Sequence, residues 1–344
     1  MGANKLLRSD SWPLRAILVM VALGATQCGT GGTLIDGTFQ GAKPGASGTA
    51  STSSAAQTAA PTATTPGGGS SAKGAATVGV EVDTQGGAID VDFWSGAVAA
   101  VGSLSKSPRP AARIVVGSYR SSSGVNLAYA DDEGASALPK GRSGVTFTGD
   151  RGAEALLTAL DGLGASVVLE IQPGFAPLPT LTAEVLQHYK NHKSVVGVGI
   201  NLVYYGTDAD NLGFVSLSDA DAQAIVQAVQ KTGSSATVYL RHYSSDYMPP
   251  KARSGLGFVF DAEGFNDLDD MSSDYRTWAS KFAPAPVQFV TGASKDRAWS
   301  CALSGGAATL MAQALKVGDN VDNVTWSSST ITRLYPANTF GCLN

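Results

Sequence analysis

The amino-acid sequence predicts an α/β fold, a single (β/α)8 barrel of the TIM type, and three observations carry that prediction. Eight short apolar runs rich in β-branched residues recur between residues 77 and 328, with six helical patterns between them. Several runs are continuously apolar, which indicates strands covered on both faces, as in a parallel sheet. No Gly-rich phosphate turn follows the first run, so a closed barrel is favoured over a doubly wound sheet.

The clearest repeating unit lies between residues 166 and 205. SVVLEIQPG and SVVGVGINLVYY predict two buried parallel strands joined by the amphipathic helix TLTAEVLQHYKNH. Each strand becomes polar at its C-terminal end, where barrels of this kind carry their functional residues. Glu170 and Gln172 on the first strand and Asn201 on the second are therefore candidate site residues.

The other elements follow the same pattern along the chain. Ser218 before Asp219, with Asp221 behind it, predicts a capped helix start. Residues 119–150 lack a strong helical pattern, so we expect the second crossover to be an extended loop. We expect strands at residues 77–83, 113–119, 166–172, 194–203, 236–243, 256–263, 287–292 and 323–328, and helices at residues 93–104, 153–163, 181–192, 219–231, 268–282 and 307–317.

Residues 1–28 have the order of an export signal. Basic residues precede the apolar run AILVMVALGAT, and small residues lead from it to Cys28. Cys28 is a candidate lipidation site that would attach the protein to a membrane, and Ala22-Leu23-Gly24 is an alternative site of ordinary cleavage. We therefore expect an exported protein, either lipid-anchored in the cell envelope or secreted.

Residues 29–76 consist almost wholly of Gly, Ser, Thr, Ala and Pro. Such a segment buries too little apolar area to offset its ordering entropy, which predicts a disordered linker. The barrel domain then spans residues 77–344. A net charge of −4 and the absence of a basic run argue against nucleic acid as a partner.

The cysteines predict one disulfide. If Cys28 carries a lipid, Cys301 and Cys342 remain as a pair in an oxidising compartment, and we expect them to be bonded. Two buried free thiols are the alternative. We expect no metal and no cofactor, since His188 and His192, although spaced four apart on one helix face, have no third ligand nearby in the sequence.

Several motifs, taken in order, resemble a family of exported, little-characterised barrel proteins that are similar to glycoside hydrolases. They are SVVLEIQPG, HYKNHKSVVGVGINLVYY, VYLRHY with the following YMPP, and KFAPAPVQFVTG. The resemblance implies a carbohydrate or cell-wall glycan as the ligand. Where this chain has Glu170 and Gln172, the family has Gln and Glu, and where this chain has Asn201 and Val203 it has Asp and Glu.

Those differences affect the residues that a hydrolase needs. Glycoside hydrolysis ordinarily uses two carboxylates, and Asn201 cannot transfer a proton at neutral pH. Two hypotheses follow: a glycoside-hydrolase-like barrel that binds or weakly hydrolyses a carbohydrate at the C-terminal face of the strands, and a catalytically inactive cell-surface binding or structural protein on the same fold.

If the protein is an enzyme, its candidate catalytic residues are the carboxylates at the strand ends. Glu170 is the candidate acid, although an ion pair with Arg241 or Arg120 is the alternative role. Asp261 and Glu263 share a strand face and are the candidate base, unless they belong to the acidic loop that follows them. Glu81 and Asp83 alternate in the same way at the end of the first strand.

The candidate substrate-binding residues are polar or aromatic groups at the same end of the predicted strands. Hydrogen bonds to sugar hydroxyls and flat surfaces for sugar rings are the roles that we expect, with packing of the barrel top as the alternative. Tyr204 and Tyr243 are further aromatic candidates. The assigned residues are Gln172, Asn201, Tyr205, Arg241, His242 and Trp326.

Overall fold

A computed structural model describes residues 76–84, 87–104, 109–120, 124–131, 137–140, 144–207, 215–333 and 335. The export signal, Cys28, Cys342 and nearly all of the 29–76 linker lie outside these residues, so the export, the lipidation, the linker and the disulfide stay predictions. None of the helices in the described part of the chain is long and apolar enough to cross a membrane.

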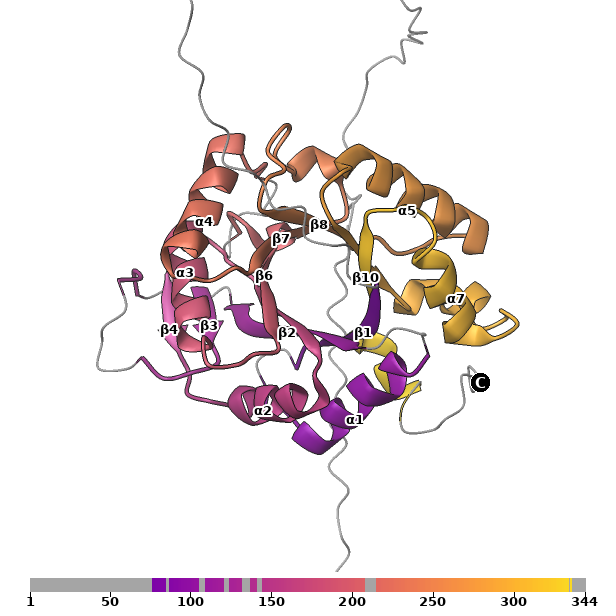
Figure 1. Ribbon diagram of the computed structural model, residues 1–344, viewed down its shortest axis with the longest axis horizontal. Coiled ribbons are helices and arrows are strands. Elements are labelled where there is room, and N and C mark those ends of the chain that lie inside the picture. The colour runs from indigo at the N-terminus through magenta and orange to yellow at the C-terminus, as the bar shows by residue number, and fades with distance from the viewer. Residues whose placement is uncertain are drawn as a thin grey trace, which may run out of the picture. The chain divides into compact units, whose positions relative to one another are not determined.

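Eight parallel strands close into a barrel with helices around it (Figure 1), which confirms the predicted fold class. Each strand pairs with the next barrel strand along the chain, and β1 pairs with both β2 and β10, which closes the ring. The strands are β1 (Thr77–Val82), β2 (Pro110–Arg120), β5 (Ser166–Ile171), β6 (Val195–Asn201), β7 (Thr237–His242), β8 (Leu256–Phe260), β9 (Val287–Thr291) and β10 (Val321–Trp326).

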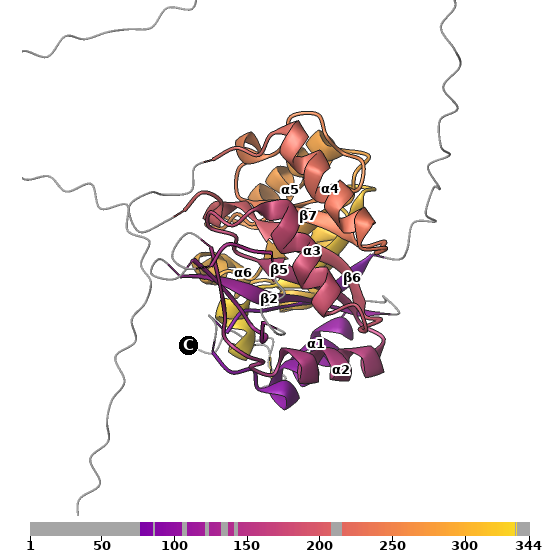
Figure 2. The ribbon, with the colours of Figure 1, turned by 90° about the vertical axis from the view of Figure 1, so that its left-hand side faces the viewer.

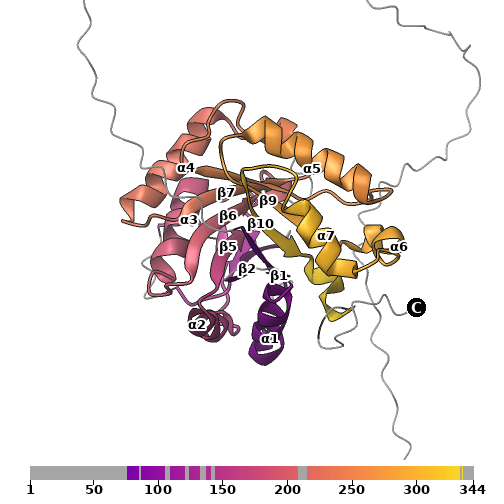
Figure 3. The ribbon, with the colours of Figure 1, turned by 45° about the vertical axis from the view of Figure 1, so that its right-hand side comes forward.

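The helices pack on the outer face of this barrel. Figure 2 shows α3 beside α4, and Figure 3 shows α5 beside α7. The bounds predicted for α2, α4 and α5 are those observed. The helices are α1 (Val91–Gly102), α2 (Ala153–Leu163), α3 (Leu178–His188), α4 (Asp219–Lys231), α5 (Leu268–Phe282), α6 (Arg297–Ser300) and α7 (Gly306–Ala314).

Side-chain caps explain why two of these predictions are accurate. The Ser218 hydroxyl accepts a hydrogen bond from the backbone N–H of Asp221 at 3.1 Å and begins α4. Asp267 accepts from the backbone N–H of Asp270 at 2.9 Å and begins α5 in the same way. By contrast, α3 begins three residues earlier than predicted, since Pro179 fits the first turn of a helix.

The long loop predicted for the second crossover contains regular structure of its own. It contains two short strands, β3 (Gly124–Leu127) and β4 (Val145–Phe147). The last residues of β2 continue past the barrel and pair antiparallel with β3, which pairs in parallel with β4. The extra residues at the end of β2 therefore provide the edge with which β3 pairs, and the sequence pattern did not indicate this extension.

One part of the barrel interior is apolar and is built around one aromatic ring. Val168, Tyr239, Val259 and Val290 form a buried cluster separate from the packing between strands and helices. The Tyr239 ring lies between two glycine-bearing strands, since a Cβ on Gly257 would stand 2.4 Å from it. The Tyr239 hydroxyl donates to Asp322 Oδ2 at 2.7 Å.

A charged cluster joins α2 to the end of α3. His192 Nε2 lies 2.8 Å from Glu154 Oε2, and its Nδ1 lies 2.8 Å from Asp161 Oδ2. His188 stacks on Tyr129 at 3.8 Å between ring centroids and lies 3.4 Å from Glu154. The two histidines thus interact with carboxylates of the neighbouring helix.

The His192 contacts predict a pH-dependent contribution to stability. Burial opposes the imidazolium, but hydrogen bonds and charges from Glu154 and Asp161 outweigh it and raise the pKa of His192. Because the pKa of His192 is higher in the folded than in the unfolded protein, its protonation stabilises the fold. This contribution is complete below the unfolded pKa of about 6.5 and is lost as pH rises through the folded pKa. We expect His192→Gln to lower the free energy of unfolding by about 0.5–1 kcal/mol at pH 5.5, and by less at pH 8.5.

Urea unfolding of both proteins at the two pH values measures this difference. An equal loss of stability at pH 5.5 and pH 8.5 would show that His192 acts through packing alone.

Candidate functional site

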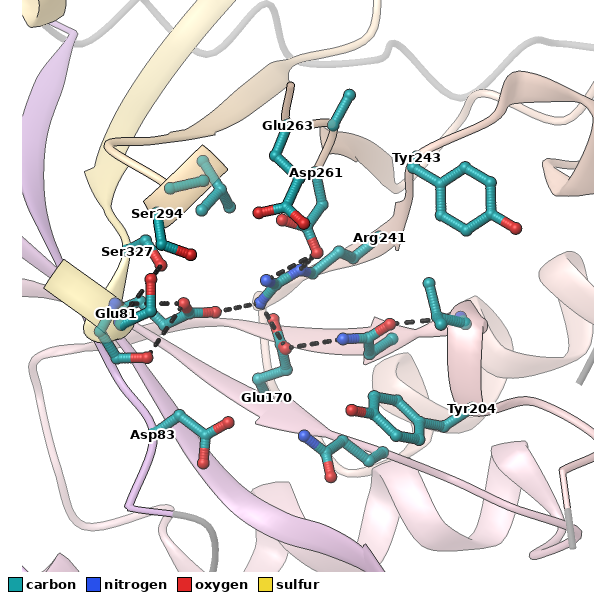
Figure 4. Close-up of a pocket in the computed structure, with 18 of the residues that line it drawn as sticks. Glu81, Asp83, Glu170, Tyr204, Arg241, Tyr243, Asp261, Glu263, Ser294 and Ser327 are labelled. Carbon is teal, nitrogen blue, oxygen red and sulfur yellow. Dashed lines mark hydrogen bonds and ion pairs between the residues drawn. The ribbon is translucent and has the colours of Figure 1, made fainter. Parts of the chain in front are cut away.

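A cavity of about 610 Å³ opens at the C-terminal ends of the barrel strands. Its lining is polar and comes from strand ends and the loops that follow them (Figure 4). The lining residues are Glu81, Asp83, Glu170, Gln172, Asn201, Val203, Tyr204, Arg241, Tyr243, Asp261, Ala262, Glu263, Val290, Ala293, Ser294, Lys295, Ser327, Ser328 and Ser329.

Arg241 lies at the floor of this cavity and contacts three carboxylates. Its Nη1 donates to Glu170 Oε1 at 2.7 Å and also to Glu81 Oε1. Its Nε and Nη2 both lie 2.8 Å from Asp261 Oδ2. Figure 4 shows these contacts as dashed lines. Arg241 itself is only 6% exposed. The predicted ion pair between Glu170 and Arg241 is confirmed.

A second buried arginine lies below the first. Arg113 Nη1 donates to Glu170 Oε2 at 2.8 Å, and its Nη2 donates to the side chain of Gln288. Glu170, with no exposed surface, therefore bridges two guanidinium groups. Gly199 makes room for this arrangement, since a Cβ there would lie 2.7 Å from Arg113 Nη1.

Arg113 was not among the predicted site residues, although the sequence contains a signal for it. Arg113 is a charged residue within the apolar β2 run, and side chains alternate between the two faces of a strand. A cation facing the barrel interior requires a buried anion. Glu170 on the neighbouring β5 was the available partner, because the register places the two strands side by side.

The buried charges do not balance. Two guanidinium groups, Arg113 and Arg241, face three carboxylates, Glu81, Glu170 and Asp261. Burial raises the pKa of Asp261 to about 6, with the charges of Glu81 and Glu170 adding to the effect of burial and Arg241 opposing it. For Glu81 burial also acts to raise the pKa, but the ion pair with Arg241 prevails and lowers it.

Asp261 and Glu263 follow β8 rather than belonging to it, because the strand ends at Phe260. Both line the cavity, but they contact different cations. Asp261 contacts Arg241, whereas Glu263 lies 2.6 Å from Lys295 at the exposed rim. Of the two, Asp261 belongs to the buried charge cluster.

Gln172 and Asn201 line the cavity as predicted, and each also has a structural contact. Gln172 Oε1 accepts from the backbone N–H of Tyr119 at 2.9 Å. Asn201 Nδ2 donates to Glu170 Oε1 at 3.3 Å, and its Oδ1 accepts from the backbone N–H of Val203 at 3.2 Å. The end of β6 thus presents an amide and an apolar side chain to the cavity, and no carboxylate.

His242 was predicted to bind the ligand, but it lies outside the cavity. It follows Arg241 on β7 and points to the opposite face of the strand, where it is 1% exposed. Its ring lies 4.3 Å from that of Tyr247, and Nδ1 accepts from the backbone N–H of Ser244 at 2.8 Å. Burial lowers its pKa to about 4, so the imidazole is neutral at pH 7.

Trp326 and Tyr205 also differ from the prediction. Trp326 is 7% exposed, its ring covers Gly292, and its Nε1 donates to Thr330 Oγ1 at 2.8 Å. Tyr205 is half-buried beside the cavity lining, and its neighbour Tyr204 lines the cavity instead. The short 3-10 turn Leu202–Tyr204 after β6 decides which of the two tyrosines faces inward.

Cys301 directly follows α6 and is half-buried. Because Cys342 lies outside the described residues, the Cys301–Cys342 pairing stays a prediction.

No protein-family model and no curated protein matches the sequence. Solved structures with similar architecture include XacCel5A, which has also been solved with cellopentaose, at 11% identity and a TM-score of 0.43, with 73% of this chain and 88% of the other covered. A GH5-4 broad specificity endoglucanase from Clostridium acetobutylicum is 12% identical, with a TM-score of 0.44 and 73% and 87% covered.

A third similar structure is 2,3-dimethylmalate lyase, a member of the PEP mutase/isocitrate lyase superfamily. It is 13% identical, with a TM-score of 0.36 and with 74% of this chain and 76% of the other covered. Similarity at this level concerns the barrel alone, and function has to be argued from the site.

The charge imbalance predicts a large effect on stability for one substitution and a small effect for another. Arg241→Met leaves three buried carboxylates without their shared cation, and we expect it to lower the free energy of unfolding by about 3–5 kcal/mol. Asp261→Asn leaves two carboxylates for two guanidinium groups, and we expect a change of less than about 1 kcal/mol. Urea unfolding at pH 7.5 measures both.

The pH dependence provides a second check. The pKa of Asp261 is higher in the folded than in the unfolded protein, so its protonation stabilises below about pH 4 and this contribution is lost as pH rises through about 6. The stability of Asp261→Asn relative to the wild type should therefore increase from pH 4 to pH 7.5. If Asp261→Asn destabilised as strongly as Arg241→Met, the imbalance would not be the controlling feature.

Proposed function

We propose that this glycoside-hydrolase-like barrel binds a carbohydrate in the cavity at the C-terminal ends of its strands. The single observation that carries the proposal is the chemistry of the cavity lining, in which hydroxyl, amide and carboxylate groups surround a space of about 610 Å³. Sugars offer many hydroxyl groups that donate and accept hydrogen bonds, and such a lining provides both kinds of partner.

Two aromatic rings add a second kind of contact. Tyr204 and Tyr243 line the cavity, and Tyr243 is 45% exposed although its ring is large and apolar. The apolar face of a sugar ring packs against such a surface, while the phenolic hydroxyl remains available for a hydrogen bond. A ligand with both hydroxyl groups and apolar faces fits this combination.

The arrangement of the carboxylates favours binding over hydrolysis. Hydrolysis places an acid and a nucleophile or base on either side of the scissile bond. Glu81 and Glu170 instead accept hydrogen bonds from one nitrogen of Arg241, so the guanidinium occupies the space between them. A sugar cannot enter between two carboxylates that are held in this way.

Weak hydrolysis is the second candidate, and the state of Asp261 favours it. Burial raises the pKa of Asp261 to about 6, and its side chain is 29% exposed, so a fraction of these carboxyl groups is protonated and open to the cavity near pH 6. That combination suits a general acid, with Glu263 in the same cavity as the base. Glu170, which has no exposed surface, suits the acid role less well.

We further propose that the protein acts outside the cytoplasm. Residues 1–28 have the order of an export signal, and Cys28 offers a site for a lipid anchor. A disulfide between Cys301 and Cys342 would suit the same compartment. Cell-wall glycans are the carbohydrates that such a protein meets there.

Binding can be tested with a panel of cell-wall and plant oligosaccharides by isothermal titration calorimetry. We expect at least one oligosaccharide to bind, and we expect Tyr243→Ala to weaken its binding about 3- to 10-fold, because the exposed ring surface is lost. Analysis of reducing ends in the same mixtures should detect no cleavage.

Phe175→Ala is the matched control, since Phe175 is 46% exposed and does not line the cavity. We expect it to leave binding unchanged. An equal effect of the two variants would place binding elsewhere, and the absence of binding across the panel would refute the proposal. Cleavage that Asp261→Asn abolishes would instead establish the second candidate.

A further inference from the structure

The cavity lining contains more acidic than basic side chains. Its five carboxylates, Glu81, Asp83, Glu170, Asp261 and Glu263, face only two cations, Arg241 and Lys295. Arg113 below the floor adds one positive charge, through its contact with Glu170. The lining and this arginine together therefore carry a negative charge at neutral pH.

Asp261 is the point at which the excess charge of the buried cluster is accessible. The side chains of Glu81 and Glu170 are 7% and 0% exposed, whereas that of Asp261 is 29% exposed. Glu263, the carboxylate at the exposed rim, lies against Lys295 at 2.6 Å. Of the carboxylates bound to Arg241, Asp261 is thus the one that a ligand reaches.

One oxygen of Asp261 is available to a ligand. Both contacts with Arg241 end on Oδ2, at 2.8 Å each. Within the described residues, no side-chain or backbone donor bonds to Oδ1. Oδ1 therefore has unused acceptor capacity, and it lies at the edge of a cluster with excess negative charge. A cationic hydrogen-bond donor would bind at such an oxygen.

We propose that the bound carbohydrate carries a primary ammonium group, as a deacetylated amino sugar does, and that this group binds Asp261 Oδ1. The proposal rests on carbohydrate binding in the cavity and specifies the class of carbohydrate. An ammonium group supplies a third positive charge beside Arg113 and Arg241, so that three cations match three carboxylates. A neutral sugar leaves the imbalance in place.

The state of Asp261 in the free protein supports this assignment. Several groups act on it: Arg241 on β7, Glu81 on β1 and Glu170 on β5, while its own charge acts on Tyr204 after β6 and on Tyr275 of α5. Burial and the neighbouring carboxylates raise the pKa of Asp261 to about 6, so that a proton partly offsets the excess charge. An ammonium group would compete with that proton, and its affinity should increase from pH 5 to pH 7.

The test compares oligomers of glucosamine with oligomers of N-acetylglucosamine of the same length by isothermal titration calorimetry at pH 7. We expect the glucosamine oligomer to bind at least about 5-fold more tightly, and the ratio of the two affinities to fall to about one in Asp261→Asn. We also expect the ratio of the two affinities in the wild type to be smaller at pH 5 than at pH 7. This measurement tests the inference without the variant if Asp261→Asn does not fold.

Asp246→Asn is the matched control, because Asp246 is an exposed acid in the loop after β7 that does not line the cavity. The ratio of the affinities for the two oligomers in this variant should equal that of the wild type. Equal affinities of the two oligomers, or a preference that Asp261→Asn leaves unchanged, would overturn the inference while leaving carbohydrate binding intact. If neither these oligomers nor any neutral oligosaccharide binds, the proposed function itself fails, and the inference fails with it.

Discussion

The guanidinium group of Arg241 connects parts of the barrel that are far apart in the sequence. It binds carboxylates that follow or belong to three other strands: Glu81 on β1, Glu170 on β5 and Asp261 after β8. Buried ion pairs of this kind add little net stability, because desolvation offsets the attraction, but they define one geometry. The shape of the cavity floor, the protonation of Asp261 and the position of Asn201 all depend on this contact.

The interior of the barrel contains two groups of side chains with different chemistry. One group is apolar and surrounds the Tyr239 ring, as the interior of a TIM barrel usually is. The other group consists of the two arginines and their carboxylates. Gln288 connects the two groups, since it accepts from Arg113 and also interacts with Tyr239.

The sequence predicted the fold well because the signals for it are local. Apolar runs rich in β-branched residues marked all eight strands, and the Ser218 cap marked the start of α4. The site was predicted in part. Glu170, Asp261 and Arg241 meet in the cavity, but the pairing of Arg113 with Glu170 depends on strand register.

The differences between the predicted and the observed cavity lining arise at the ends of strands. Adjacent residues on a strand point to opposite faces, so Arg241 and His242 could not both reach the cavity. The turn after β6 likewise directs Tyr204 into the cavity, whereas its neighbour Tyr205 does not line it. Strand ends are the positions at which sequence patterns are least exact, and barrels place their functional residues there.

The close contact between Gly199 and Arg113 has an evolutionary consequence. Any side chain at position 199 would occupy the space of the guanidinium group, since a Cβ would lie 2.7 Å from Arg113 Nη1. A lineage that acquires a larger residue at 199 must therefore first lose the arginine, and Glu170 then loses one of its two cations. The two positions constrain each other across β2 and β6, so they should vary together among homologous chains and remain unchanged where the buried charge cluster is retained.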